Sequence, residues 1–274
     1  MKLLGRTFLV VLALVYSMVG LSQSEQTFDS LVWADEFNGE GPLDSDKWFH
    51  QTQLPSWGEW FGGLLNHYTD REENAYQEDG NLNLVAIREK YKDQGYEKDF
   101  TSARLNSKFA FTYGRLEVRA KMPEGVGTWP AIWMLNTNII EAGAYWETKG
   151  YGTTSWPHCG EIDILEHWGK NQDFVQSALH NSSSYGGEVV NLGGLKIENV
   201  SSEFHTYVME WTKDKITFSV DGKEMYTYQP KVKNNATWPY DSDYYVIMNI
   251  AIEREIDPDF KQSAMVVDYI RVYQ

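Results

Sequence analysis

The fold and chemistry of this chain are decided by one stretch, Trp156-Pro157-His158-Cys159-Gly160-Glu161-Ile162-Asp163-Ile164-Leu165-Glu166-His167-Trp168-Gly169. It contains three carboxylates within six residues, separated by isoleucine and leucine, which favour strands or fill cores. Because residues two apart share a face of a strand, Glu161 and Asp163 should point together, opposite Ile162 and Ile164. The stretch therefore predicts a strand with one acidic face and one buried face.

Glu166 breaks this alternation. In a regular strand it would lie on the apolar face, where an unpaired charge is very unfavourable. Either the strand ends at Leu165, or a β-bulge at Ile164-Leu165 returns Glu166 to the face of Glu161. Bulges re-aim side chains and are frequent beside active sites. With a bulge, three acids would lie along one face.

Two interpretations of that face are open at this point. It could be the solvated side of an acidic edge strand, or it could hold the two carboxyl groups that a retaining glycosidase needs about 5–5.5 Å apart. Strand rise alone would separate the backbones of the two glutamates by roughly 13 Å. The strand would therefore have to bend and the side chains lean together, so spacing alone does not decide.

Composition narrows the classes of function. The chain has 274 residues, of which 42% are hydrophobic, and it includes 11 Trp and 17 Tyr. This composition is globular, and the surplus of Trp and Tyr suggests exposed stacking platforms. The net charge of −15 argues against nucleic acid, whose binding depends on Lys and Arg neutralising phosphates, and against anionic membranes and polyanionic substrates. A neutral substrate is the best match.

The N-terminus has the pattern of a signal peptide over residues 1–22. Lys2 and Arg6 form a positive start, residues 8–16 are apolar, and a plausible cleavage site lies near Ser22. No second long apolar run follows, so we expect no membrane span. The mature domain would comprise residues 23–274 and would be secreted or periplasmic.

Cys159 is the only cysteine, so no intramolecular disulfide can form. A thiol nucleophile needs positively charged neighbours that stabilise its thiolate, whereas Cys159 lies beside carboxylates in the sequence. We therefore expect it to be a small buried residue rather than a catalytic one.

Strand signals dominate the rest of the chain, and long amphipathic helical patterns are absent. About a dozen alternating or apolar segments are separated by turns, with no βαβ rhythm, linker or internal repeat. This pattern predicts an all-β fold, an antiparallel β-sandwich of the jelly-roll type whose concave face forms a substrate-binding cleft. The expected strands outside the opening stretch cover residues 31–37, 81–88, 101–106, 108–113, 115–122, 128–135, 174–180, 206–212, 215–220, 223–228, 244–252 and 265–273.

Two loops carry unusual numbers of aromatic residues. Residues 50–65 include Trp57, Trp60 and Phe61 in a glycine-rich setting, which either anchors the loop on the core or forms a sugar-stacking rim. Residues 136–158 form a long loop that leads directly into the acidic strand, and long loops in compact domains are usually functional or disordered.

Together these residues resemble glycoside hydrolase family 16, and within it the bacterial laminarinases, which are endo-β-1,3-glucanases. The run 160–166 resembles the bulged Glu-x-Asp-x-x-Glu signature of that family. Residues 112–123, 127–135 and 267–273 are similar to the segments before the signature and to the closing strand, and 33–37 and 74–86 also match. The resemblance covers essentially the whole mature chain.

The resemblance implies a role for each acid. Glu161 would be the nucleophile, Glu166 the acid/base, and Asp163 the partner beside the nucleophile. Clustered like charges raise a pKa, which agrees with a protonated Glu166. The residues that the family places in or beside the cleft are Trp129, Trp133, His180, Arg104, Trp156 and Asn66.

Family members often carry a structural calcium on the convex side. The matching positions are Glu36, Gly80 through its carbonyl oxygen, and Asp268, and oxygen ligands suit calcium. The chemistry itself needs no cofactor.

Several functions stay open. The substrate would be β-1,3-glucan (laminarin) or mixed-linkage β-1,3-1,4-glucan, with agar- or carrageenan-type galactan hydrolysis, transglycosylation and non-catalytic β-glucan binding as alternatives. Glu161 and Glu166 are both present, which favours the enzyme over the lectin. We expect a monomer whose partner is a polysaccharide.

Overall fold

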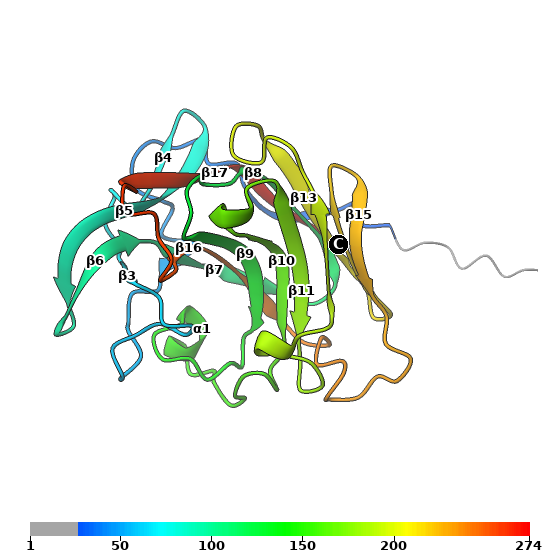
Figure 1. Cartoon of the computed structure of the whole chain (residues 1–274). Helices are drawn as coiled ribbons and strands as arrows, with labels where there is room; N and C mark the ends of the chain where they lie inside the picture. The colour runs from blue at the N-terminus through cyan, green and yellow to red at the C-terminus, as the bar shows by residue number, and fades with distance from the viewer. Residues whose placement is uncertain (1–26) are drawn as a thin grey trace, which may run out of the picture.

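The computed structural model describes residues 27–274, so the predicted signal peptide lies outside the described residues. Two β-sheets pack face to face and enclose a single large hydrophobic core (Figure 1). The jelly-roll sandwich predicted from the strand pattern is confirmed. Within residues 27–274, no helix combines the length and apolar character needed to cross a membrane.

One sheet has seven strands and carries the acidic stretch at its centre. Every pairing in it is antiparallel. Its order is β12 (Leu192–Lys196), β11 (Phe174–His180), β10 (Glu161–His167), β9 (Thr128–Asn136), β16 (Tyr244–Ile252), β7 (Arg104–Phe111) and β2 (Trp48–His50).

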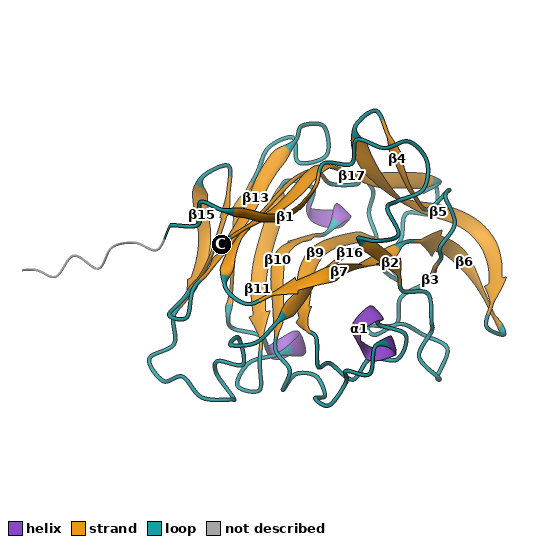
Figure 2. Ribbon diagram, turned by 180° about the vertical axis from the view of Figure 1, so that it is seen from behind, coloured by secondary structure: helices purple, strands orange, loops and turns teal. Residues whose placement is uncertain are grey.

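The other sheet has ten strands and lies behind the first, as the reverse view shows (Figure 2). The main path runs β15 (Lys223–Tyr228), β14 (Ile216–Val220), β13 (His205–Trp211), β8 (Gly114–Lys121), β17 (Gln262–Tyr273), β5 (Asn81–Asp93), β6 (Tyr96–Ser102) and β3 (Asn66–Tyr68). β1 (Leu31–Asp35) pairs with β17, and β4 (Ala75–Glu78) pairs with β5. The short β3–β6 pair is parallel, which departs from the fully antiparallel expectation.

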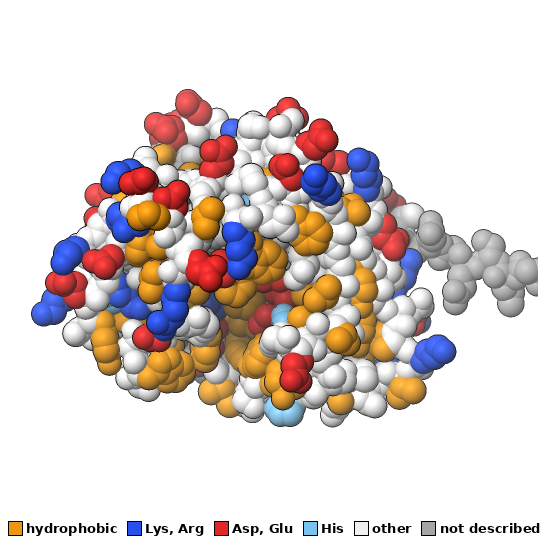
Figure 3. All heavy atoms as spheres, in the orientation of Figure 1, with side chains coloured by type: hydrophobic (Ala, Val, Ile, Leu, Met, Phe, Trp, Pro, Cys, Tyr) orange, Lys and Arg blue, Asp and Glu red, His pale blue; other side chains and the backbone are white. Residues whose placement is uncertain are grey.

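Alternation along the strands decides which side chains enter the core. Ile162 and Ile164 of β10 and Met134 of β9 are fully buried between the sheets. The residues between them project from the outer face of the seven-stranded sheet. Loops and the short helix α1 (Tyr145–Thr148) border this face, and the space-filling view shows it hollowed, with acidic and histidine side chains at the bottom (Figure 3).

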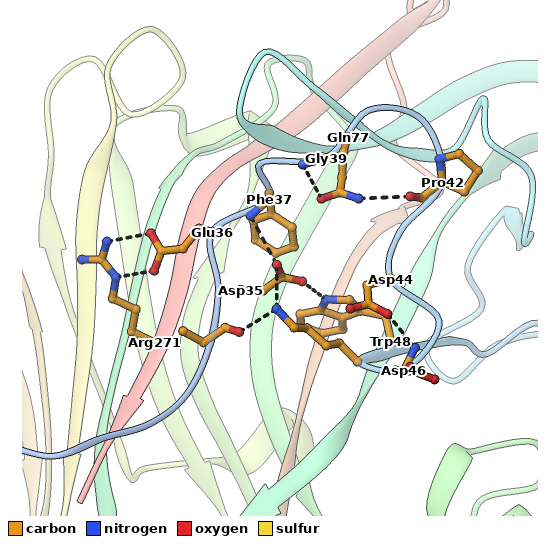
Figure 4. A network of polar contacts seen from close by, with 12 residues as sticks. Asp35, Glu36, Phe37, Gly39, Pro42, Asp44, Asp46, Trp48, Gln77 and Arg271 are labelled. Atoms are coloured by element: carbon orange, nitrogen blue, oxygen red, sulfur yellow. Dashed lines mark hydrogen bonds and ion pairs between the residues drawn. The ribbon is translucent and has the colours of Figure 1, made fainter.

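The N-terminal segment is fastened by Asp35 (Figure 4). Its carboxylate accepts hydrogen bonds from the indole Nε1 of Trp48 at 2.8 Å and from Lys47 Nζ at 3.2 Å. These bonds join β1 to the start of β2, so the two sheets are tied at this edge by a buried, charge-assisted contact.

Candidate active site

The predicted β-bulge is present in β10 and decides the orientation of Glu166. Against β9, Asp163 pairs with Trp133 and Leu165 with Ile132, so two steps on β10 match one on β9. Against β11, Glu166 pairs with Gln176, again with one extra residue on β10. The alternative, a strand ending at Leu165, is wrong. Glu161, Asp163 and Glu166 therefore share the outer face.

The strand starts at a position that only glycine can occupy. Gly160 has φ +77°, and a Cβ there would lie 2.3 Å from the hydroxyl oxygen of Tyr244. The same hydroxyl donates a hydrogen bond of 2.7 Å to the carbonyl oxygen of Cys159. The residue before Glu161 is thus held against β16, which fixes where the acidic face begins.

Glu161 receives donors from two directions. The indole Nε1 of Trp156 donates to Oε2 at 3.0 Å, and His180 Nε2 lies 3.6 Å from Oε1. Burial raises the pKa of Glu161 well above its ordinary range, and the charge of Asp163 raises it further, whereas His180 and the indole bond oppose that rise.

Asp163 lies between the other two acids and is nearly inaccessible to solvent. Burial raises its pKa to about 8, and its Oδ2 lies 3.1 Å from His180 Nε2. Glu161 and Asp163 therefore resist being ionised together. A protonated Asp163 removes the nearest negative charge from Glu161, which makes ionisation of Glu161 easier.

Glu166 has a similar pair of donors at the other end of the acidic face. The indole Nε1 of Trp129 lies 3.1 Å from Oε1, and Gln176 Nε2 lies 3.4 Å from Oε2. Burial, followed by the charge of Asp163, raises the pKa of Glu166 to about 8. Glu166 therefore has the protonation state of a general acid at neutral pH.

Both tryptophans of β9 lie on the acidic face, as their spacing predicted. The Trp133 indole Nε1 donates to Asn249 Oδ1 at 2.8 Å, and Asn249 in turn donates to the hydroxyl of Tyr68. Trp129 stacks on Trp168, with 5.8 Å between ring centroids. These contacts hold the two indole rings in place on the face that bears the carboxylates.

Arg104 and Asn66 were predicted to lie in or beside the cleft, but both side chains are buried. Arg104 is 6% exposed, and its Nη2 donates to both carboxylate oxygens of Glu141, at 2.8 and 3.0 Å. It packs on the Trp133 ring at 4.9 Å and so supports a cleft residue from behind. Asn66 is fully buried, and its Oδ1 accepts the backbone N–H of Ile252. A sugar contact by Asn66 is therefore a wrong prediction.

The predicted calcium ligands are engaged elsewhere. The Glu36 carboxylate accepts hydrogen bonds from Nε and Nη2 of Arg271, at 2.8 and 2.7 Å. Its side chain points away from that of Asp35 (Figure 4). Asp268 is ion-paired with Arg119. Both carboxylates are paired with arginine, so neither is available to bind a calcium ion in this arrangement.

One group of three side chains among residues 27–274 brings ligand atoms close enough to share a metal ion. Glu161, Asp163 and His180 offer atoms that lie within 4.8 Å of one another. These are the groups of the acidic face itself, so the same atoms would serve either a cation or acid–base chemistry.

The remaining residue predictions have clear outcomes. Cys159 is buried, and burial raises the pKa of its thiol to about 12, as expected for a residue without a nucleophilic role. In the aromatic loop, Trp60 is buried and anchors the loop on the core, while Trp57 and Phe61 are each 59% exposed.

Three functional residues escaped the sequence prediction. Gln176 could have been found, because it lies four residues before His180 on one strand and thus shares its face. Asn249 and Glu141 gave no local signal, since their partners Trp133 and Arg104 are distant in the sequence.

Comparison with known proteins agrees with this geometry. A family model described as "Glycosyl hydrolases family 16" matches residues 66–271. A β-glucanase of Rhodothermus marinus is 35% identical over all of this chain and 96% of its own length. The structure of LamA from Zobellia galactanivorans with laminaritriose and laminaritetraose has TM-score 0.83 and 40% identity, covering 90% of this chain and all of that one.

A third relative is a solved non-specific endo-β-1,3(4)-glucanase called SCLam. It has TM-score 0.79 and 33% identity, and the match covers 91% of this chain and 93% of that one. The family model and the relatives span the acidic strand, both sheets and the closing strand. The chain belongs to glycosyl hydrolase family 16.

Proposed function

We propose that this protein is an endo-acting retaining glycoside hydrolase that cleaves β-1,3-glucan or mixed-linkage β-1,3-1,4-glucan. The observation that carries the proposal is the bulged strand β10, which presents Glu161 and Glu166 on one face with a separate indole donor for each. The relatives described above, a β-glucanase, a protein bound to laminari-oligosaccharides and an endo-β-1,3(4)-glucanase, support the substrate class.

In the first step the ionised Glu161 attacks the anomeric carbon. The glycosidic C–O bond breaks, and Glu166 gives its proton to the departing oxygen. The raised pKa of Glu166 keeps that proton available at neutral pH. The product is a covalent glycosyl-enzyme with the aglycone released.

In the second step Glu166, now ionised, takes a proton from water. The water oxygen attacks the anomeric carbon, the bond to Glu161 breaks, and the configuration of the original linkage is restored. The Trp156 indole and His180 stabilise the carboxylate of Glu161 as it leaves.

The test is incubation with laminarin, lichenan, agarose and κ-carrageenan, with product sizing and detection of the first-formed anomer. We expect oligosaccharides of intermediate length and β-anomers from one or both glucans. The Glu161→Gln variant is the control. Binding to glucan without cleavage by the wild type would instead support a non-catalytic lectin, and cleavage of agarose or carrageenan would overturn the glucan assignment.

We also propose that the protein is exported. The support is the charged and apolar pattern of residues 1–22, with small residues at the expected cut. Sequencing the N-terminus of protein recovered outside the cytoplasm should begin at Gln23. A mature protein that retains Met1 would contradict the proposal.

A further inference from the structure

The loop over residues 57–65 exposes two aromatic side chains at one end of the hollowed face. Trp57 and Phe61 are each 59% exposed and contact one another, with ring centroids 5.4 Å apart. Trp60 of the same loop is buried and packs edge-on against Tyr68 at 4.8 Å. The exposure of Trp57 and Phe61 is therefore not a consequence of an unanchored loop.

The loop is continuous with the acidic face. A Cβ on Gly62 would lie 3.9 Å from the ring atom Cζ3 of Trp129, the residue that donates to Glu166. The hydroxyl of Tyr68, on which Trp60 packs, bonds Asn249, which accepts the indole of Trp133. The loop that carries the exposed pair thus contacts Trp129 directly and Trp133 through buried side chains.

Between this loop and β6 lies a hollow of about 330 Å³. Its lining combines the aromatic rings of Trp57 and Tyr96 with charged groups of both signs, Glu59, Lys98 and Arg254. Arg254 and Glu59 form an exposed pair at 3.6 Å, so each has hydrogen-bonding capacity left for a ligand. Figure 3 shows hydrophobic and basic side chains side by side to the left of the central hollow that holds the acidic side chains.

This lining suits a neutral, polyhydroxylated ligand. An aromatic side chain stacks on the apolar face of a sugar ring, while the charged groups form hydrogen bonds with the hydroxyls at the edge of the ring. Since charges of both signs are present, a charged ligand would meet repulsion as well as attraction. A saccharide is the class of ligand that uses both kinds of surface.

We propose that this hollow is a distal glucan-binding site, in which sugar units remote from the cleaved bond stack on Trp57 and hydrogen-bond to Arg254 and Glu59. The inference rests on the proposed function, because its ligand is the far end of the same β-glucan chain. The site would favour substrates long enough to occupy the carboxylates and the loop at the same time.

The test measures kcat/KM on laminari-oligosaccharides of increasing length for the wild type and Trp57→Ala. The variant should match the wild type on the shortest cleaved oligosaccharide and lose roughly three- to tenfold on the longest, the value of one aromatic stacking contact. Arg254→Ala should show a smaller, length-dependent loss. The matched control is Val232→Ala, which also removes a 65% exposed apolar side chain, but outside this loop.

Binding of the long oligosaccharide to the Glu161→Gln background gives a second readout, in which Trp57→Ala should weaken affinity by the same factor. Equal losses on short and long substrates, or no loss with an unchanged melting temperature, would overturn the distal site and leave the proposed function intact. A wild-type protein that cleaves no β-glucan of any length would overturn both.

Discussion

At the two ends of the acidic strand β10, the two glutamates receive an indole hydrogen bond from different kinds of structural element. Each glutamate receives one indole N–H, at 3.1 Å for Glu166 and 3.0 Å for Glu161. The donor for Glu166 is Trp129 on the neighbouring strand β9, whose position follows from sheet register. The donor for Glu161 is Trp156, a 40% exposed residue on the long loop before the strand.

This difference has a functional meaning. A donor on a central strand is held by the sheet hydrogen bonds, whereas a donor on a loop depends on the contacts that fasten the loop. Trp156 contacts Tyr185 edge-on at 5.4 Å, and the loop is tied to β7 through the Glu141–Arg104 pair. The acid/base end should therefore be rigid, and the nucleophile end should respond to changes in the loop.

The largest expected effect separates the chemical roles of the two ends. Glu161→Ala and Glu166→Ala should each lower kcat by about 10⁴-fold or more, because each removes an essential group. Added azide should rescue Glu161→Ala with an inverted glycosyl azide and Glu166→Ala with a retained one, as NMR of the products would show. Unchanged activity of Glu161→Ala would contradict the assignment of Glu161 as the nucleophile.

The two indole donors can be compared directly through Trp156→Phe and Trp129→Phe. Each substitution keeps an aromatic ring and loses one hydrogen bond to a glutamate of the acidic face, so kcat/KM should fall roughly 10- to 100-fold. Both bonds lower the pKa of their glutamate. Trp156→Phe should therefore move the acidic limb of the pH–rate profile upward, and Trp129→Phe the alkaline limb upward from about pH 8. Shifts of the same limb in both variants would contradict the separate roles.

The fastening of the loop is tested by Glu141→Ala. It leaves the buried Arg104 unpaired, which should cost about 3–5 kcal/mol and lower the melting temperature by roughly 10 °C. Activity of the folded protein should also fall, because Trp156 loses a support of its loop. The double variant Arg104→Met with Glu141→Leu should recover much of the stability. A melting temperature unaffected by Glu141→Ala would show that the loop is held by other contacts.

A smaller effect concerns Asp163, which both ends share. Its pKa is raised from 3.8 to about 8 in the folded protein, so between these values the folded state holds a proton that the unfolded state has lost. Stability must then decrease as pH rises through this window. Asp163→Asn removes the effect and should raise the melting temperature most above pH 8, with little difference near pH 4. An equal shift at both pH values would argue against the raised pKa.

The smallest effect is expected outside the acidic face, at Glu36 and Asp268. Because Glu36 and Asp268 are paired with Arg271 and Arg119, EDTA should leave the melting temperature unchanged. Glu36→Gln serves as the comparison, since it weakens the arginine pair without involving a metal. A clear drop on adding EDTA, reversed by calcium, would show that the carboxylates exchange arginine for the ion.

Much of the site could be predicted from local pattern. Alternation assigned Ile162 and Ile164 to the core, and the misplaced charge of Glu166 required the bulge that the pairing with β9 shows. The four-residue spacing placed Trp129 and Trp133 on one face. These predictions succeed because the two-residue period of a strand is a property of neighbouring residues and needs no knowledge of distant ones.

The sequence by itself therefore determined the sandwich, the acidic face and the family. Only the tertiary structure decided what each side chain of the site touches: that Trp156 donates to Glu161, that Arg104 is neutralised by Glu141, and that Asn66 is buried. It also separated the buried Trp60 from the exposed Trp57 within one loop. These contacts join segments that only folding brings together, and burial and charge pairing across such distances leave no periodic trace in the chain.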